Sequence, residues 1–182
     1  MNLARYQARL NPDMPLVLMT DERRCDWARA ARALPRGSLV VVRARDTKKR
    51  LALAETLHGI APLLIADDPA LAAGIGAAGL HLPELRMREA FHWRARFAHW
   101  IITSSAHSLR ALMGAHQLDA VFLSPVFATQ SHKQARPLTP LRAAFIAARA
   151  PVPVYALGGV THRNAALLAP AFSGIAAISS LL

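Results

Sequence analysis

The stretch SLVVVRARDTKKRLALAETLHGIAPLLIA, residues 38–66, decides the fold class. It begins with an apolar, β-branched run of strand length (38–43) and ends with a second apolar run (62–66), with a helical pattern between them. Two strands joined in this way lie parallel in one sheet, because a parallel pair needs a long crossover connection. The stretch therefore predicts an α/β protein with a parallel sheet covered by helices.

The same strand-and-helix unit recurs along the chain. Further apolar runs of strand length are spaced by about 20 residues, the size of one such unit. They are residues 16–19, 79–82, 98–103, 119–123, 152–157 and 174–178. The resulting eight runs favour a closed (β/α)8 TIM-type barrel over an open sheet. Only Ser179–Leu182 follow the last run, so we expect a compact barrel without a full eighth helix. Either Met1–Leu10, which has a helical pattern, or a second subunit would cover the opening.

Capping residues indicate where several helices begin. Such starts occur at Asp68-Pro69, Ser108, Thr139-Pro140 and Thr161. The segment GIGAAG (74–79) matches the letters of the dinucleotide-binding pattern, but it follows a predicted helix and precedes a predicted strand. Pyrophosphate binding needs the opposite order, so we interpret these glycines as a helix end and a loop.

Length and composition exclude several classes of protein. The 182 residues are 53% hydrophobic, which excludes a disordered chain and predicts a single domain over residues 1–182. The one cysteine, Cys25, excludes an intramolecular disulfide and a zinc site of several thiolates. No apolar run reaches the roughly 18 residues that span a bilayer, and no signal peptide is evident. We therefore expect a cytoplasmic protein without a membrane partner.

The net charge of +11 does not identify a ligand by itself. Most basic residues are arginines spread among alanine and leucine, as on the exposed faces of amphipathic helices. Solvated helix faces are the favoured explanation, followed by attraction of anionic small molecules. Nucleic acid is the least favoured partner, because a binder would more often gather its cations in a patch or combine them with exposed aromatics.

Candidate site residues follow the predicted strands, at the face where barrel enzymes hold their active sites. Arg43 and Arg45 end the second strand on the same side and suit a diphosphate, or else form a solvated junction. Asp67 follows the third strand and could hold a hard cation such as Mg²⁺, whereas Asp68 is explained as a helix cap. His107, after the fifth strand, could act as an acid or base or satisfy a local hydrogen bond.

The loops after the last three strands carry groups that suit a phosphorylated ligand. Loop 124–138 has a length that is usually functional or disordered, and its hydroxyls and cations could close over such a ligand. Backbone N–H groups after the seventh and eighth strands lie where barrels commonly bind phosphate. The candidates in these loops are Thr129, Ser131, His132, Lys133, Gly158, Gly159, Ile178 and Ser179.

Several motifs resemble those of thiamine phosphate synthase and its TenI-like relatives. SPVFATQSHK (124–133) is similar to the family's PVF-x-T-x-[TS]-K loop, and VYALGGV (154–160) to its P-V-x-A-I-G-G signature. AGLHLPE (78–84) looks like the segment G-[VL]-H-L, while IITSSAHSLRAL (101–112) and GIAAISS (174–180) add matching context. The pieces occur in the family's order and cover nearly the whole chain.

The resemblance implies a barrel that joins hydroxymethylpyrimidine diphosphate to hydroxyethylthiazole phosphate, releases pyrophosphate and uses Mg²⁺. It assigns Arg43, Arg45 and Lys133 to the diphosphate. It assigns Asp67 to Mg²⁺, with Glu84 as the only acidic residue available for a second ligand. Ser105, Thr129, Ser131 and His132 match further substrate-binding positions of the family.

Departures from the synthase pattern leave other activities open. Val41 and Ala66 stand where the synthases have glutamine and asparagine, so part of the diphosphate and metal site is missing. One alternative is a TenI-like thiazole tautomerase, with His107 as general acid and base. Another is a non-catalytic barrel that binds a phosphorylated ligand. In each case we expect phosphorylated small molecules as partners, and a homodimer is one expected assembly.

Overall fold

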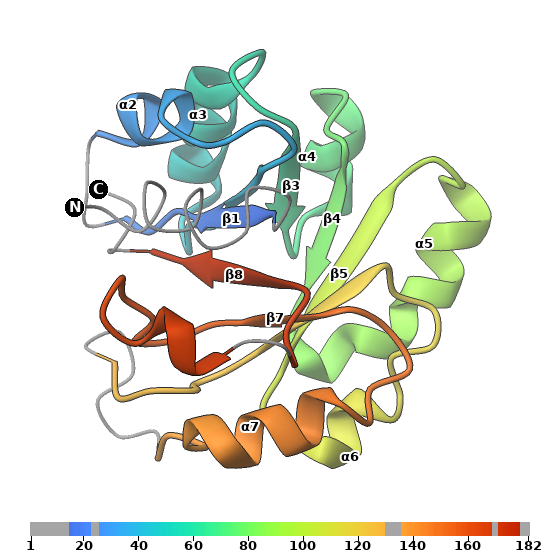
Figure 1. Ribbon diagram of the computed structural model, residues 1–182. Coiled ribbons are helices and arrows are strands. Elements are labelled where there is room, and N and C mark those ends of the chain that lie inside the picture. Colours follow the sequence, from blue (N-terminus) through green and yellow to red (C-terminus); the bar gives the residue numbers. More distant parts are fainter. Residues whose placement is uncertain (1–14, 23–25, 130–135, 169–170, 179–182) are drawn as a thin grey trace.

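Eight parallel strands form a closed barrel in the computed structural model, which describes residues 15–22, 26–129, 136–168 and 171–178 (Figure 1). Each strand pairs with the next in the chain, and β8 pairs with β1, which confirms the predicted barrel. The strands are β1 (Leu16–Met19), β2 (Leu39–Val42), β3 (Leu63–Ala66), β4 (Gly79–Leu82), β5 (Ile101–Ala106), β6 (Ala120–Leu123), β7 (Val154–Ala156) and β8 (Gly174–Ala177).

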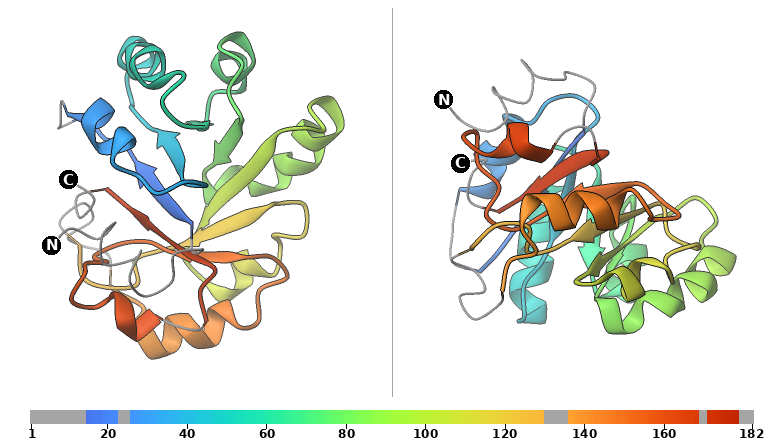
Figure 2. Two further views of the ribbon diagram at one scale, coloured as in Figure 1. Left: turned by 45° about the horizontal axis from the view of Figure 1, so that its top comes forward. Right: turned by 60° about the horizontal axis from the view of Figure 1, so that its bottom comes forward.

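Helices lie outside the ring of strands, as Figure 2 shows. The α-helices are α2 (Trp27–Arg32), α3 (Thr47–Leu57), α4 (Pro69–Gly74), α5 (Ala90–Arg96), α6 (Leu109–Leu112) and α7 (Pro140–Ala147). Two 3₁₀ helices cover Glu84–Glu89, after β4, and Ala165–Leu168, after β7. None of the helices within the described ranges is both long and apolar enough to cross a membrane.

Three of the four predicted helix starts are confirmed, and two of them carry a side-chain capping bond. Asp68 accepts a hydrogen bond from the first turn of α4, and Ser108 does the same for α6. Thr139 precedes α7 as predicted, but its φ of +67° leaves its side chain without a capping bond. Thr161 is followed only by a 3₁₀ turn, so the full helix expected there is wrong for the described residues. Asp46, which the sequence interpretation did not identify, caps α3.

The fifth strand begins three residues later than predicted. Trp100 is buried and stacks on Phe97 with ring centroids 3.8 Å apart, and its N–H donates to the Phe97 carbonyl at 3.0 Å. These contacts make residues 97–100 a turn, so β5 starts at Ile101. The strand continues to Ala106, which pairs with Leu123 of β6. Ser105 therefore lies within the strand.

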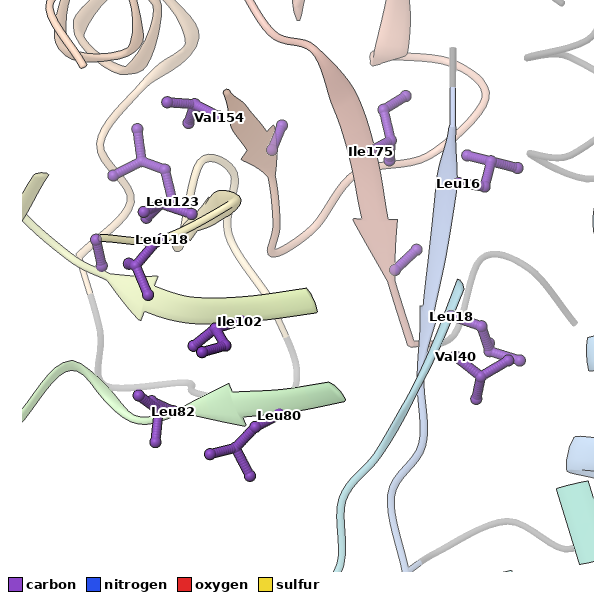
Figure 3. Close-up of a cluster of buried hydrophobic side chains, with 14 of the residues drawn as sticks. Leu16, Leu18, Val40, Leu80, Leu82, Ile102, Leu118, Leu123, Val154 and Ile175 are labelled. Carbon is purple, nitrogen blue, oxygen red and sulfur yellow. The ribbon is translucent and has the colours of Figure 1, made fainter. Parts of the chain in front are cut away.

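Side chains alternate between two apolar layers, as strand geometry requires. The outward layer packs between the strands and the helices, and ten of its members are labelled in Figure 3. The inward layer fills the barrel and includes Val17, Met19, Val41, Leu64 and Phe122. The alternation of β2 continues past Val41, and it places Arg43 and Arg45 on the inward side at the carboxyl end of the barrel.

Two expectations lie outside the described residues: the cover formed by Met1–Leu10 and the lack of a full eighth helix after Ile178. The single-domain interpretation of residues 1–182 stays a prediction.

Candidate active site at the carboxyl ends of the strands

A cavity of about 710 Å³ opens at the carboxyl ends of β1 to β5. It brings together four residues predicted for the site: Arg43, Arg45, Asp67 and Ser105. A second cavity, of about 590 Å³, lies at the opposite end of the barrel between the segments that precede β2 and β3, and it contains none of the predicted residues. Because barrel enzymes work at the carboxyl face, the first cavity is the candidate site.

The backbone that carries Arg43 and Arg45 is fixed from the end of β1. The Thr20 hydroxyl accepts from the Arg43 N–H at 2.8 Å and donates to the Arg43 carbonyl at 3.2 Å. The Glu22 carboxylate accepts from the backbone N–H groups of Arg45 and Asp46, and these bonds lower the pKa of Glu22. Within the described ranges, neither the Arg43 nor the Arg45 guanidinium pairs with a carboxylate. Both cations therefore remain available to an anionic ligand.

A third arginine of the cavity, Arg50 on α3, is already engaged. Its Nε and one terminal nitrogen donate to the Ala44 carbonyl at 3.1 and 2.7 Å, and its other terminal nitrogen pairs with Asp68 at 2.9 Å. Asp68 in turn caps α4. Arg50 therefore ties the loop after β2 to the loop after β3.

His81 of β4 is a buried polar residue at the floor of the cavity. Its Nδ1 lies 2.8 Å from the Thr103 hydroxyl, its Nε2 lies 3.0 Å from the Ser105 hydroxyl, and its ring stacks on Phe122. Burial, with a smaller contribution from the charge of Arg43, lowers the pKa of His81 to about 3. The imidazole is therefore neutral near pH 7, and one of its nitrogens donates while the other accepts. This arrangement holds the Ser105 hydroxyl in place.

The two carboxylates assigned to Mg²⁺ are both engaged by nitrogen donors. Asp67 lies after β3 in the left-handed region, with φ of +55°, and its carboxylate forms an ion pair with Arg86. Glu84 accepts from the backbone N–H of His107 at 2.7 Å. The described parts of the chain contain no group of three or more His, Cys, Asp or Glu side chains arranged to hold a metal ion. As they stand, these residues do not fit a magnesium site built from protein ligands.

His107 lies beside the site rather than in the cavity lining. Its Nδ1 is 2.7 Å from the Ser124 carbonyl, which can only accept, so Nδ1 carries the proton and Nε2 is the basic atom. The side chain is exposed. His107 could exchange a proton at Nε2, but the structure also gives it the local hydrogen bond that was the alternative interpretation.

Gly158 and Gly159 allow the loop after β7 to approach the loop after β6. Both have positive φ, and a Cβ on Gly159 would lie 2.2 Å from the Ala128 carbonyl oxygen. Phe127 donates its N–H to the Gly158 carbonyl at 3.0 Å. Within the described ranges, no hydrogen bond uses the N–H of either glycine, so both remain available to a phosphate oxygen.

The remaining predicted residues divide between described and undescribed segments. Thr129 and Ile178 are described and half-buried. Ser131, His132, Lys133 and Ser179 lie outside the described residues.

Sequence reasoning missed five contributors to the site: Thr20, Glu22, Arg50, His81 and Arg86. A signal existed for His81 alone, since a histidine at an inward position of an otherwise apolar strand needs buried partners. Thr20 and Glu22 act through backbone contacts 23 residues away, which no local pattern encodes.

Comparisons with known proteins agree with this architecture. A family model described as thiamine monophosphate synthase matches residues 16–181. A protein of Aquifex aeolicus, provisionally named thiamine-phosphate synthase 2, is 32% identical over 160 residues, covering 79% of this chain and 82% of the relative. A thiamine-phosphate synthase of Lysinibacillus sphaericus is 33% identical over 131 residues, covering 68% of this chain and 60% of the relative.

A solved structure supports the fold. The thiamine phosphate pyrophosphorylase of Pyrococcus furiosus superimposes with a TM-score of 0.72 at 22% identity, over 91% of this chain and 86% of the other. With the family match over residues 16–181, the chain belongs to the thiamine monophosphate synthase family, a family of transferases.

Proposed function

We propose that this transferase joins hydroxymethylpyrimidine diphosphate to hydroxyethylthiazole phosphate and releases pyrophosphate. The observation that carries the proposal is the position of Arg43 and Arg45 at the mouth of the cavity, where neither forms an ion pair with a carboxylate of the described residues. Two guanidinium groups beside one another match the oxygens of a diphosphate. The named relatives are thiamine-phosphate synthases, which agrees with this assignment.

The reaction breaks the bond between the primary carbon of the pyrimidine and a diphosphate oxygen. The electron pair leaves with the diphosphate, and the thiazole nitrogen supplies the pair for the new carbon–nitrogen bond. Negative charge therefore grows on the leaving group, where Arg43 and Arg45 stabilise it. Ser105, held by neutral His81, presents a hydroxyl to the substrates in the cavity.

The second substrate carries a phosphate of its own. The N–H groups of Gly158 and Gly159, which no hydrogen bond uses within the described ranges, lie after β7, where barrels commonly bind phosphate. We assign them to the thiazole phosphate. Two bound anions at opposite sides of the barrel mouth would hold the two reacting rings between them.

The tautomerase alternative is not favoured. Its proposed general acid and base, His107, forms a local hydrogen bond with the Ser124 carbonyl, and the named relatives are synthases. A cytoplasmic location, a homodimer, and the absence of nucleic-acid and membrane partners stay predictions.

The direct test of the proposed function is incubation with both precursors, followed by identification of the products by mass. Thiamine phosphate and pyrophosphate should form in equal amounts, and only when both precursors are present. Formation of neither product, with or without Mg²⁺, would contradict the proposal.

Substitution Arg43→Ala should weaken pyrophosphate binding by roughly tenfold or more, since a charge-assisted hydrogen bond is worth about 1.5–3 kcal/mol. The fold should stay intact, because the side chain ends a strand and contributes little packing. Calorimetric titration of pyrophosphate measures the effect.

The matched control for this substitution is Arg142→Ala, which removes an equal charge from the exposed surface of α7. It should bind as the wild type does. Equal pyrophosphate affinities for the wild type, Arg43→Ala and Arg142→Ala would show that Arg43 does not bind the diphosphate.

A further inference from the structure

Arg86 holds the carboxylate that was expected to bind magnesium. This arginine lies in the 3₁₀ helix after β4, and one terminal nitrogen donates to Asp67, in the loop after β3. The Asp67 side chain is 47% exposed and lines the cavity, so the ion pair is at the rim of the candidate site. The Arg86 guanidinium thus contacts the same carboxylate, that of Asp67, that would have to bind a metal ion.

Glu89 fixes the same guanidinium from its other edge. Nε and the second terminal nitrogen of Arg86 donate to the two oxygens of Glu89, each at 2.6 Å. Such a two-pronged contact orients the planar group as well as binding it. The hydrogen bonds with Glu89 raise the pKa of Arg86 above its already high ordinary value, and they lower the pKa of Glu89. Arg86 is therefore a permanent, oriented cation.

The second carboxylate that the sequence assigned to the metal, Glu84, offers no replacement. Glu84 is used by the His107 backbone N–H, as described above. A magnesium ion held by Asp67 would first have to displace Arg86, and it would find one carboxylate there. Because Arg86 already neutralises the Asp67 carboxylate, the local charges favour this arginine over a metal ion.

We propose that the Arg86 guanidinium takes the place of a divalent cation on Asp67, so that this enzyme binds the diphosphate group without a metal ion held by the protein. Arg86 cancels the charge of Asp67, which would otherwise repel the diphosphate. Arg43 and Arg45 then contact the diphosphate oxygens directly. This inference rests on the proposed function for the identity of the substrate, and it adds no reactant to that reaction.

The first test is titration of pyrophosphate in a buffer containing EDTA. The wild type should bind under these conditions, and Arg86→Ala should bind at least tenfold more weakly, because Asp67 is then uncompensated beside the ligand. The control is Arg88→Ala, which removes an equal charge from an exposed position of the same helix and should match the wild type. Failure of the wild type to bind without Mg²⁺, or equal binding by Arg86→Ala, would overturn the proposal.

The second test adds the metal. With Mg²⁺ in place of EDTA, Arg86→Ala should recover much of its lost affinity, because the freed carboxylate can share the ion with pyrophosphate. Mg²⁺ also binds free pyrophosphate, so Arg88→Ala is titrated under the same conditions as the reference. If Mg²⁺ does not restore the pyrophosphate affinity of Arg86→Ala relative to this reference, the idea that arginine and metal can replace one another on Asp67 is contradicted.

The third test measures the metal alone. Titration with Mn²⁺, a spectroscopic substitute for Mg²⁺, should show no tight site in the wild type and a new site in Arg86→Glu, where a second carboxylate reaches toward Asp67. A tight site in the wild type that Arg86→Glu leaves unchanged would overturn the proposal. None of these readouts needs turnover, so an enzyme that fails the product assay can still support or contradict the role of Arg86.

Discussion

Gly79→Ala should lower the free energy of unfolding by at least about 3 kcal/mol. Gly79 opens β4 and pairs with Ile101 of β5, and a Cβ at this position would lie 1.9 Å from the Ile101 carbonyl oxygen. The obstacle is backbone on a neighbouring strand, so no rotation of a side chain relieves it. The two strands must part, and the hydrogen bonds between them are then strained or lost.

Denaturation by urea measures this loss, and Gly74→Ala is the matched control. Gly74 ends α4, five residues before Gly79, and no heavy atom lies within 4 Å of a Cβ placed on it. Its φ is not positive, so alanine should change stability by no more than about 1 kcal/mol, in either direction. A Gly79→Ala variant as stable as Gly74→Ala would show that β4 and β5 are farther apart than the structure has them.

Acidification should destabilise the protein through His81 before its carboxylates are protonated. The pKa of His81 falls from 6.5 in the unfolded chain to about 3 in the folded one, so the unfolded chain binds the extra proton between these values. Stability is therefore fully present above pH 6.5 and falls as pH decreases, by about 1.4 kcal/mol per unit. Between pH 6.5 and 4.5 the loss should reach about 2–3 kcal/mol.

The matching experiment compares unfolding of wild type and His81→Gln at several pH values in this range. Glutamine keeps a hydrogen-bonding group and does not titrate, so the variant should lack the slope that His81 contributes, whatever its stability at pH 7.5. The range stops at pH 4.5 because Glu22 and Glu89 have lowered pKa values, and their stabilising contributions are lost only below it. An identical slope in the two proteins would mean that His81 protonates without opening the barrel.

Features with a local or periodic cause could be predicted from the sequence. Strand-length runs at regular intervals gave the closed barrel, and the alternation of β2 placed Arg43 and Arg45 on the inward side at its carboxyl end. The glycines of GIGAAG end α4 and lead into β4, as their order along the chain indicated. Each of these three features depends on the conformation of a short stretch of neighbouring residues, so a local pattern can predict it.

Contacts between distant loops could not be predicted in this way. The sequence presented Asp67 as an open carboxylate, because nothing near it shows that Arg86, 19 residues later, donates to it. Likewise, the partner of Glu84 is a backbone N–H, which is present at nearly every residue and leaves no compositional signal. The start of β5 was misplaced for a related reason, since Trp100 reads as a strand residue but stacks on Phe97.

The side-chain contacts at the barrel mouth form a belt that runs from one loop to the next. Glu22 ties the first loop to the second, Arg50 the second to the third, and Arg86 the third to the fourth. Glu84 and His107 carry the belt on to the fifth and sixth loops. The second to fifth loops are thus each braced by both of their neighbours, and this part of the rim should move as one unit. An anion that pulls the second loop inward would draw the loops on either side with it, and the mouth would tighten around the second substrate.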